Sequence, residues 1–231
     1  MINVVVPMAG LGKRTKDYSN LPKPLIEVEG KRIFQLATKP INIKSNLIFI
    51  VLDEHLKYGI VKEVSRAHPD SRIIVQPKKM RGSVESVLLS ESCIKPGPLL
   101  IIDCDISVKI DVAAEIKKIL AFGVDGAILI SKNNSTDYSY VKINNGRIIE
   151  IAEKRAISNN AISGMYFWKD SSDYFKYAKQ LINSNVSING EFYNSMVFEI
   201  AIKDGKDIAP IFTEEFYHLG TAESIVKYLN R

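Results

Sequence analysis

The segment Ile2–Leu25 reads INVVVPMAGLGKRTKDYSNLPKPL and predicts a strand followed by a basic loop that contains glycine. The apolar run at its start is typical of a strand that is buried on both faces of a sheet. Gly10 and Gly12 then allow backbone N–H groups to approach a ligand closely. Arg14 and Lys23 add permanent positive charge, and a proline on each side of Lys23 restricts the backbone there. The segment therefore predicts an anion-binding loop at the carboxyl end of the first strand of an α/β sheet.

Two well-known phosphate-binding motifs do not fit this loop. The dinucleotide fingerprint requires a third glycine at the position that Thr15 occupies. The Walker A motif requires Gly-Lys-Ser/Thr after four intervening residues, and that sequence is also absent.

The first half of the chain alternates apolar runs with amphipathic patterns, which is typical of a mostly parallel sheet covered by helices on both faces. Further strands are predicted at Leu47–Leu52, Arg72–Gln76, Leu99–Asp103 and Ala127–Ile130, and helices at His55–Ala67, Val84–Leu88 and Val112–Leu120.

The second half has a different pattern. Asn145-Gly146 is a strong turn signal and predicts a hairpin over Tyr138–Ile151. We expect this hairpin to build a small lobe beside the sheet. The remaining predicted elements are a strand at Ala161–Trp168, helices at Ser171–Ile182 and Tyr193–Ile202, a strand at Ile208–Phe212 and a C-terminal helix capped by Thr221.

The composition indicates a globular protein, and its mild positive charge suits a small anionic molecule as well as nucleic acid. Of 231 residues, 46% are hydrophobic and 25% are charged, and the net charge of +5 is only mildly basic. Cys93 and Cys104 have no metal-binding spacing, which favours a reducing compartment. No leader-like segment or membrane-spanning run is visible, so we expect a cytoplasmic protein. We expect neither nucleic-acid nor membrane partners, and the sequence leaves a homo-oligomer open.

The motif Met8-Ala9-Gly10-x-Gly12-x-Arg14, followed by Pro22-Lys23-Pro24, resembles the signature of the sugar-phosphate nucleotidyltransferases, of the glucose-1-phosphate thymidylyltransferase and uridylyltransferase kind. The resemblance extends over nearly the whole chain. It implies one domain over residues 1–231 with a Rossmann-like mixed sheet, a nucleotide-binding half at about 1–132 and an acceptor-binding half at about 133–231. Later segments that resemble family motifs are Gln76 with Gly82-Ser83, Asp103-Cys104-Asp105, Glu153-Lys154, Gly164-Met165-Tyr166-Phe167 and His218-Leu219-Gly220-Thr221.

The resemblance implies a role for each matching residue. It implies that Arg14, Lys23 and Asp105 are catalytic, and that Asp105 binds Mg²⁺, with Asp103 as a second candidate ligand and Mn²⁺ as an alternative metal. The implied nucleotide-binding residues are Met8, Ala9, Gly10, Leu11, Gly12, Lys13, Gln76, Gly82 and Ser83. The implied acceptor-binding residues are Glu153, Lys154, Gly164 and His218.

The implied reaction moves a nucleotidyl group from an NTP to a phosphorylated sugar or another small phosphate and releases pyrophosphate. The attacking phosphate oxygen is already ionised at neutral pH, so no side chain has to deprotonate it. The reaction needs cations near the transferred phosphate instead. We expect a pyrimidine NTP, because the Gln76 amide offers both a donor and an acceptor to uracil, thymine or cytosine. This amide does not choose among the three bases, and we place CTP before UTP or dTTP. Surface polysaccharide synthesis is the expected pathway.

Several residues depart from the family pattern and leave alternatives open. Val84-Glu85-Ser86 replaces small residues, Ser83 and Arg155 replace the usual threonine and proline, and His218 stands where many members have a metal-binding aspartate. We expect His218 to lie outside the metal shell. The alternatives are a cytidylyltransferase for a non-sugar phosphate such as phosphocholine or a phosphorylated amino acid, a glycosyltransferase that uses a nucleotide sugar, and a non-catalytic nucleotide-sensing module.

Overall fold

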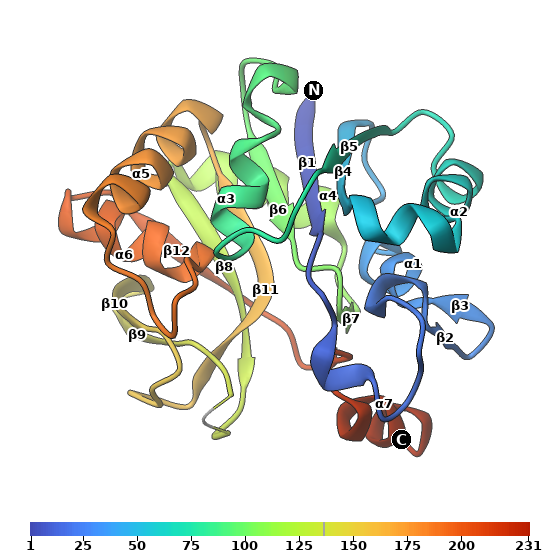
Figure 1. Cartoon of the computed structure of the whole chain (residues 1–231). Coiled ribbons are helices and arrows are strands. Elements are labelled where there is room, and N and C mark those ends of the chain that lie inside the picture. The colour runs from blue at the N-terminus through green and yellow to red at the C-terminus, as the bar shows by residue number, and fades with distance from the viewer. Residues whose placement is uncertain (136) are drawn as a thin grey trace.

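A computed structural model describes residues 1–135 and 137–231. Within them, nine strands form one sheet whose main path runs β10-β9-β11-β6-β1-β4-β5, and β8 pairs with both β11 and β12 (Figure 1). The nine strands are β1 (Ile2–Met8), β4 (Ser45–Leu52), β5 (Arg72–Gln76), β6 (Leu99–Ile102), β8 (Gly126–Lys132), β9 (Tyr140–Asn144), β10 (Arg147–Ala152), β11 (Asn160–Trp168) and β12 (Ile208–Phe212).

Two short ribbons and seven helices complete the described fold. One ribbon pairs β2 (Glu27–Val28) with β3 (Lys31–Arg32), and the other pairs β7 (Ile106–Val108) with β13 (Phe216–His218). The helices are α1 (Ile33–Thr38), α2 (Ile60–Ala67), α3 (Ser83–Leu88), α4 (Val112–Phe122), α5 (Ser171–Ser184), α6 (Asn194–Lys203) and α7 (Ala222–Leu229).

The centre of the sheet is parallel and its other half is mixed. Strands β5, β4, β1 and β6 run in the same direction, and Val5 of β1 pairs with Ile48 and with Ile101. Strand β11 is antiparallel to β6 and to β8, whereas β12 is parallel to β8. The predicted mixed α/β class is therefore confirmed. Because β1, β4, β5 and β6 are parallel, their carboxyl ends meet at one edge of the sheet, where ligands bind in such folds.

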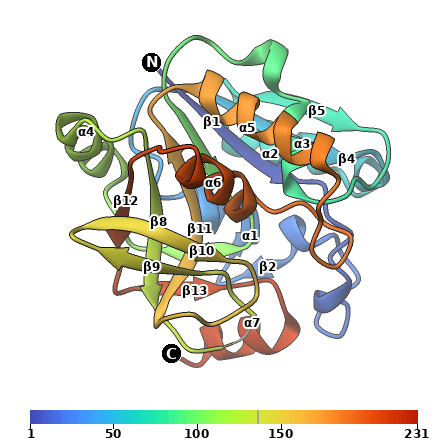
Figure 2. The ribbon, with the colours of Figure 1, turned by 90° about the vertical axis from the view of Figure 1, so that its left-hand side faces the viewer.

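Alternating side chains of β1 divide the core between the two faces of the sheet. Val5 packs in a cluster with residues of α3, α5 and α6, which cover one face (Figures 1 and 2). Val4 and Val6 point to the other face and pack with residues of α1, α2 and α4. A third cluster joins α7 to α1 through Ile33, Leu219 and other buried residues. This burial on both faces explains why the first strands read as continuous apolar runs.

The predicted helix at His55–Ala67 is the clearest error in the predicted elements. Gly59 has φ 75° and divides this stretch into a 3₁₀ segment at Asp53–Tyr58 and helix α2. A residue in the left-handed region cannot continue a right-handed helix, so the apolar spacing alone was misleading.

The predicted hairpin and the predicted helix cap are both confirmed. Asn145 and Gly146 have φ 48° and 72°, as a two-residue turn of type I′ requires, and they join β9 to β10. Thr221 precedes α7 and its side chain accepts a hydrogen bond of 3.1 Å from the N–H of Ser224.

The larger apolar side chains are used in the core. Tyr166, Phe167 and Trp168 of β11 are 7%, 1% and 0% exposed, which confirms that they are packing residues. In the described part of the chain, no helix combines the length and the apolar character that crossing a membrane requires.

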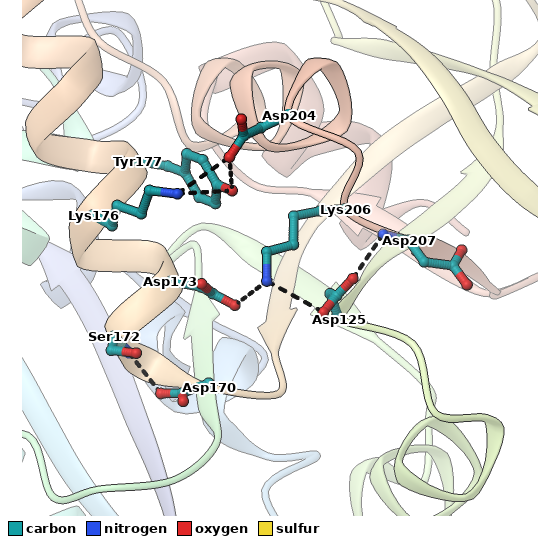
Figure 3. Close-up of polar contacts among 9 residues, drawn as sticks. All are labelled: Asp125, Asp170, Ser172, Asp173, Lys176, Tyr177, Asp204, Lys206 and Asp207. Atoms are coloured by element: carbon teal, nitrogen blue, oxygen red, sulfur yellow. Dashed lines mark hydrogen bonds and ion pairs between the residues drawn. The ribbon is translucent and has the colours of Figure 1, made fainter.

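A paired polar cluster joins α5 to the β8–β12 edge of the sheet (Figure 3). Lys206 lies between Asp173 at 2.7 Å and Asp125 at 3.3 Å. The hydroxyl of Tyr177 donates to Asp204 at 2.6 Å. Because these aspartates have partners within the cluster, we interpret it as structural.

Candidate active site

The glycine loop folds back so that its two ends touch. Gly12 has φ 62°, and a Cβ at that position would lie 3.0 Å from Cβ of Lys23. Thr15 fixes the turn between them, because its hydroxyl donates to the carbonyl of Gly12 at 2.8 Å. Pro22 and Pro24 flank Lys23 in a second short 3₁₀ turn. Glycine at position 12 therefore allows the backbone of the loop to pack against the base of the Lys23 side chain.

Lys23 and Asp105 form a largely buried ion pair at the centre of the site. The Lys23 Nζ lies 2.6 Å from Oδ2 of Asp105, and their side chains are 17% and 13% exposed. Burial acts to lower the pKa of Lys23, but the charge of Asp105, the neighbouring Cys104 and the hydrogen bond to Asp105 together outweigh burial and raise that pKa. Burial likewise acts to raise the pKa of Asp105, but Lys23 and then His218 hold it well below its usual range. Both members are therefore charged at neutral pH.

A short ribbon places His218 beside Asp105. Strands β7 and β13 pair so that His218 lies opposite Ile106, the residue after Asp105. The His218 Nε2 lies 3.5 Å from Oδ2 of Asp105. Gly220 fits closely behind both side chains, since a Cβ there would lie 2.3 Å from Nε2 of His218 and 2.6 Å from Oδ2 of Asp105. A larger residue at position 220 would push the two side chains apart.

Asp103, which follows β6, contacts Gly164 of β11. The N–H of Asp103 donates to the carbonyl of Gly164 at 2.8 Å. Gly164 has φ 74°, and a Cβ there would lie 3.1 Å from both Cβ and Oδ2 of Asp103. Burial and the nearby charges of Asp105 and Glu153 together raise the pKa of Asp103 to about 8, although Lys23 opposes them. The site therefore concentrates carboxylates that a bound cation would stabilise.

Gln76 ends β5, and its amide is held within the protein. The side chain is buried, its Oε1 accepts a hydrogen bond of 2.7 Å from the Ser86 hydroxyl, and its Nε2 donates to the carbonyl of Lys78 at 2.8 Å. Glu85 in turn accepts a hydrogen bond of 2.6 Å from the N–H of Arg81. The unusual residues Glu85 and Ser86 therefore hold the loop and the glutamine in place, a function that sequence analysis did not predict.

The Gly82 loop packs directly on the segment before α6. Gly82 has φ 112°, and a Cβ there would lie 2.4 Å from the carbonyl oxygen of Phe192. The N–H of Phe192 donates to the carbonyl of Arg81 at 2.6 Å, and the N–H of Val84 donates to the carbonyl of Phe192 at 3.4 Å. Nearby, Asn194 donates to the Ser83 hydroxyl at 3.3 Å.

The same segment reaches the predicted acceptor residues. Glu153 accepts hydrogen bonds from the hydroxyls of Ser139 and Ser195. Lys154, in the left-handed region with φ 51°, donates from Nζ to the Tyr193 hydroxyl at 2.6 Å. The residues around Ser195 and Tyr193 thus link the predicted acceptor side to the predicted nucleotide loop. No motif in the sequence marked these serines and this tyrosine.

The structure brings the predicted residues together to different degrees. Lys23 and His218 both contact Asp105. Lys13 and Arg14 are exposed on the loop, and no residue in 1–135 or 137–231 forms an ion pair with either. Met8 and Ala9 are buried at the end of β1. Among the described residues, no group of three or more histidine, cysteine, aspartate or glutamate side chains is arranged to hold a metal.

Comparison with known proteins identifies the family of the chain. A profile of the nucleotidyl transferase family matches residues 5–230. The chain belongs to this family. The sequence resemblance is thereby confirmed at the family level, and the prediction of an NTP-dependent nucleotidyltransferase is confirmed with it.

The similar proteins include sugar-nucleotide enzymes. The chain is 25% identical over 221 residues to the bifunctional protein GlmU of Wolinella succinogenes, covering 93% of this chain and 49% of that one. It therefore spans about half the length of this curated relative. Two solved structures share the fold: a nucleoside-diphosphate-sugar pyrophosphorylase from Vibrio cholerae RC9 (TM-score 0.83, 20% identity, 99% and 100% of the chains) and the inositol-1-phosphate CTP transferase from T. maritima (TM-score 0.76, 15% identity, 96% and 90%).

Proposed function

We propose that this nucleotidyl transferase joins an NTP to a small phosphorylated acceptor, with release of pyrophosphate. The observation that carries the proposal is the buried pair of Lys23 and Asp105, which lies at the carboxyl ends of β1 and β6 beside the glycine loop. This edge is where parallel α/β sheets bind their ligands. The pair supplies a permanent cation and a carboxylate, which are the two kinds of group that phosphoryl-type transfer uses.

In the proposed reaction, an oxygen of the acceptor phosphate attacks the α-phosphorus of the NTP. A P–O bond forms there, and the bond to the oxygen that bridges the α- and β-phosphates breaks with release of pyrophosphate. Lys23 neutralises the charge that develops on the α-phosphate, because its raised pKa keeps it protonated. Arg14 binds the triphosphate and the leaving pyrophosphate, and the N–H groups of Gly10 and Gly12 donate to phosphate oxygens.

The carboxylates fit a divalent cation. Asp105, with Asp103 as a second ligand, would hold Mg²⁺ or Mn²⁺. Burial, and after it the charge of Asp105, raises the pKa of Asp103, and a bound cation would offset that negative charge. Mg²⁺ is often held by one or two carboxylates together with substrate phosphates, so a larger protein cluster is unnecessary. When bound, the metal supplies charge neutralisation for the phosphates. Because Lys23 contacts Oδ2 of Asp105 in the free protein, a metal bound at that oxygen would compete with the Lys23 ammonium for it.

Gln76 is the proposed base-reading residue. Its Oε1 and Nε2 are fixed by Ser86 and the carbonyl of Lys78, so the amide has one defined orientation and keeps one N–H and one lone pair for a ligand. We assign a pyrimidine NTP, CTP before UTP or dTTP. The likeness in fold to a CTP transferase for inositol 1-phosphate is compatible with this choice.

The proposed acceptor is a phosphorylated sugar or another small phosphate, used for surface polysaccharide. Glu153 is oriented by two serine hydroxyls, and we propose that it accepts hydrogen bonds from acceptor hydroxyls. We propose that Lys154 binds the acceptor phosphate. Gly164 and His218 are the other residues proposed to line the acceptor-binding site.

A pyrophosphate-release assay tests this function. Each of CTP, UTP, dTTP and ATP is incubated with Mg²⁺ and with a panel of hexose 1-phosphates, inositol 1-phosphate, phosphocholine and phosphoserine. We expect pyrophosphate only when an NTP and one acceptor class are both present. Sugar transfer from a nucleotide sugar, without any release of pyrophosphate from NTP, would refute the proposal in favour of a glycosyltransferase.

A further inference from the structure

Lys154 differs from Lys23 in the group that holds its ammonium. Lys23 is paired with a carboxylate, whereas in the described part of the chain no carboxylate forms an ion pair with Lys154. Glu153, its neighbour in the sequence, accepts hydrogen bonds from two serine hydroxyls instead. The Lys154 Nζ donates to the Tyr193 hydroxyl at 2.6 Å and lies 4.6 Å from the centre of the Tyr193 ring. A neutral hydroxyl holds an ammonium without neutralising it, so the positive charge stays available to an anion.

The backbone of Lys154 is restricted as well. Its φ is 51°, in the left-handed region, which residues other than glycine adopt rarely. An exposed lysine side chain ordinarily samples many rotamers, and ordering such a side chain on binding lowers affinity. The left-handed backbone at one end of Lys154 and the Tyr193 hydroxyl at the other restrict this freedom before a ligand binds.

Glu191 holds Tyr193 in turn. The Tyr193 hydroxyl donates to Oε2 of Glu191 at 2.9 Å, and Oε1 of Glu191 lies 3.4 Å from Nζ of Lys79. Burial, and after it the hydrogen bond to Glu191, raises the pKa of Tyr193, so the hydroxyl keeps its proton at neutral pH. Because that single proton is donated to Glu191, the hydroxyl oxygen accepts from Lys154. Donors and acceptors therefore match along the whole chain of contacts from Lys79 to Lys154.

The backbone that carries Tyr193 is attached to the rest of the protein on its N-terminal side. Ile188 and Glu191 exchange two backbone hydrogen bonds of 3.1 and 3.0 Å. The N–H of Phe192 donates to the carbonyl of Arg81, in the loop before α3, at 2.6 Å. The Tyr193 hydroxyl is therefore presented from a fixed segment, as precise positioning of another side chain requires.

Helix capping does not explain the tyrosine at this position. Tyr193 is the N-cap residue of α6, but its side chain makes no capping hydrogen bond. Serine, threonine, aspartate and asparagine are the usual N-cap residues, because their short side chains reach the backbone of the first turn. The Tyr193 hydroxyl is instead used between Lys154 and Glu191.

We infer that Tyr193 is a positioning residue, which holds the Lys154 ammonium ready for the phosphate group of the acceptor and leaves its positive charge available. Tyr193 acts through Lys154 and not by contact with the reacting atoms. The inference rests on the proposed role of Lys154 and goes beyond it, because it adds a residue that determines how well the acceptor binds. Loss of the hydroxyl should weaken binding of the acceptor and leave NTP binding and the chemical step nearly unchanged.

The first test is steady-state kinetics of Tyr193→Phe, which keeps the ring and removes only the hydroxyl. The matched control is Tyr177→Phe, because the Tyr177 hydroxyl also makes a bond of 2.6 Å to a charged group, Asp204, in the structural cluster (Figure 3). We expect KM for the acceptor to rise about tenfold in Tyr193→Phe, as for loss of a hydrogen bond to a charged group, with kcat and KM for the NTP nearly unchanged. The control should leave all three constants unchanged.

A double-mutant cycle tests whether Tyr193 acts through Lys154. Lys154→Met should also raise KM for the acceptor, because it removes the ammonium. Adding Tyr193→Phe to Lys154→Met should cause no further rise, since the hydroxyl then has no ammonium to hold. Additive effects of the two changes would contradict the inference, and so would an unchanged acceptor KM in Lys154→Met.

The second test needs no turnover. The free protein is treated with a trace of acetic anhydride, and acetylation of each lysine is measured by peptide mass spectrometry. Lys154 should become severalfold more reactive in Tyr193→Phe, because its ammonium is released, and should keep its reactivity in Tyr177→Phe. Lys142, which is paired with Glu150 at 2.7 Å, is the internal reference.

Unchanged acetylation of Lys154 in Tyr193→Phe would overturn the inference, whatever the substrates prove to be. It would also be overturned if KM for the NTP rose as much as KM for the acceptor, which would indicate a general structural role, or if Tyr177→Phe had equal effects. Failure of the proposed function is distinguishable, because no pair of NTP and acceptor would then release pyrophosphate, whereas acetylation would still show whether Tyr193 holds Lys154.

Discussion

The Nζ of Lys23 lies 2.6 Å from Oδ2 of Asp105, although 82 residues separate them in the sequence. The cation proposed to stabilise the transferred phosphate is thus held, in the free protein, by the carboxylate proposed to bind the metal. Binding of a metal–nucleotide complex would replace one cation at Asp105 by another. The site would keep its charge balance through this exchange, which avoids leaving an unpaired buried carboxylate.

Substitution of Lys23 should reduce turnover more than nucleotide binding. We expect Lys23→Met to lower kcat by about 100- to 1,000-fold, or about 2.7–4 kcal/mol, as is typical for loss of one group that stabilises transition-state charge. Methionine keeps much of the apolar stem and limits the loss of packing. Lys109→Met, at an exposed ion pair, is the matched control and should leave kcat unchanged. A Lys23→Met enzyme with near-normal kcat would remove this residue from the chemical step.

Asp105 and His218 should differ in their importance. Asp105→Ala is expected to abolish Mg²⁺-supported activity, because it removes the proposed metal ligand. His218→Ala is expected to retain activity reduced by about 10- to 100-fold, the usual cost of removing a side chain that orients a ligand. Steady-state kinetics with Mg²⁺ and with Mn²⁺ measure both effects. Complete loss in His218→Ala, together with a shift of metal preference in the unaltered enzyme, would show instead that His218 is itself a ligand.

Gly82→Ala should lower the free energy of unfolding by more than the left-handed backbone conformation of residue 82 alone explains. The added Cβ would lie 2.4 Å from the Phe192 carbonyl oxygen, in addition to the cost of φ 112°. Gly146→Ala is the matched control, because Gly146 has φ 72° but open space around it. A left-handed residue other than glycine costs about 1–2 kcal/mol, so the control should lose about that much and Gly82→Ala should lose more. If urea unfolding shows that both variants lose the same free energy of unfolding, the Phe192 segment moves aside easily.

The pH dependence of stability should include a contribution from His68. Burial lowers the pKa of His68, whose Nε2 lies 2.9 Å from the Thr38 hydroxyl. The unfolded chain, with a histidine pKa of about 6.5, therefore binds more protons than the folded chain as the pH falls below that value. This contribution to stability is complete above about pH 6.5 and is lost on acidification.

Comparison with His68→Gln isolates this contribution. Asp103 acts in the opposite direction between about pH 4 and 8, because its raised pKa makes the folded chain hold the extra proton. That effect is common to both proteins and cancels in the difference. The free energy of unfolding should fall more steeply from pH 7.5 to 5.5 in the unaltered protein than in His68→Gln. Parallel curves would mean that His68 titrates alike in the folded and unfolded chains.

Much of the fold could be predicted because long buried strands leave a strong local pattern. Arg72–Gln76 and Ile208–Phe212 were predicted to the residue, and the Asn145-Gly146 turn was placed correctly. Helix α1 and the ribbon of β2 with β3 were missed. Strands of two residues, such as those of the ribbon, are too short to show a periodicity. Gly59 was missed as a break because the apolar spacing continues across it.

The site was predictable in part for a different reason. The order of strands in an α/β sheet places the segments after β1 and β6 together, so the nearness of Lys23 and Asp105 follows from topology. The bonds from Ser86 to Gln76 and from Lys154 to Tyr193 depend on how loops approach in three dimensions, and no local pattern encodes that approach. The family resemblance marked Gln76 and Lys154 but not the residues that orient them.

Isotope transfer tests the central claim most directly. The enzyme is incubated with Mg²⁺, its best acceptor and CTP labelled with ³²P at either the α- or the γ-phosphate, and the products are separated by chromatography. The account predicts that the α-label appears in the joined product and the γ-label in pyrophosphate, and that Lys23→Met slows both transfers by about 100- to 1,000-fold. Transfer of the γ-label to the acceptor, or release of the α-label only as free nucleoside monophosphate, would contradict nucleotidyl transfer.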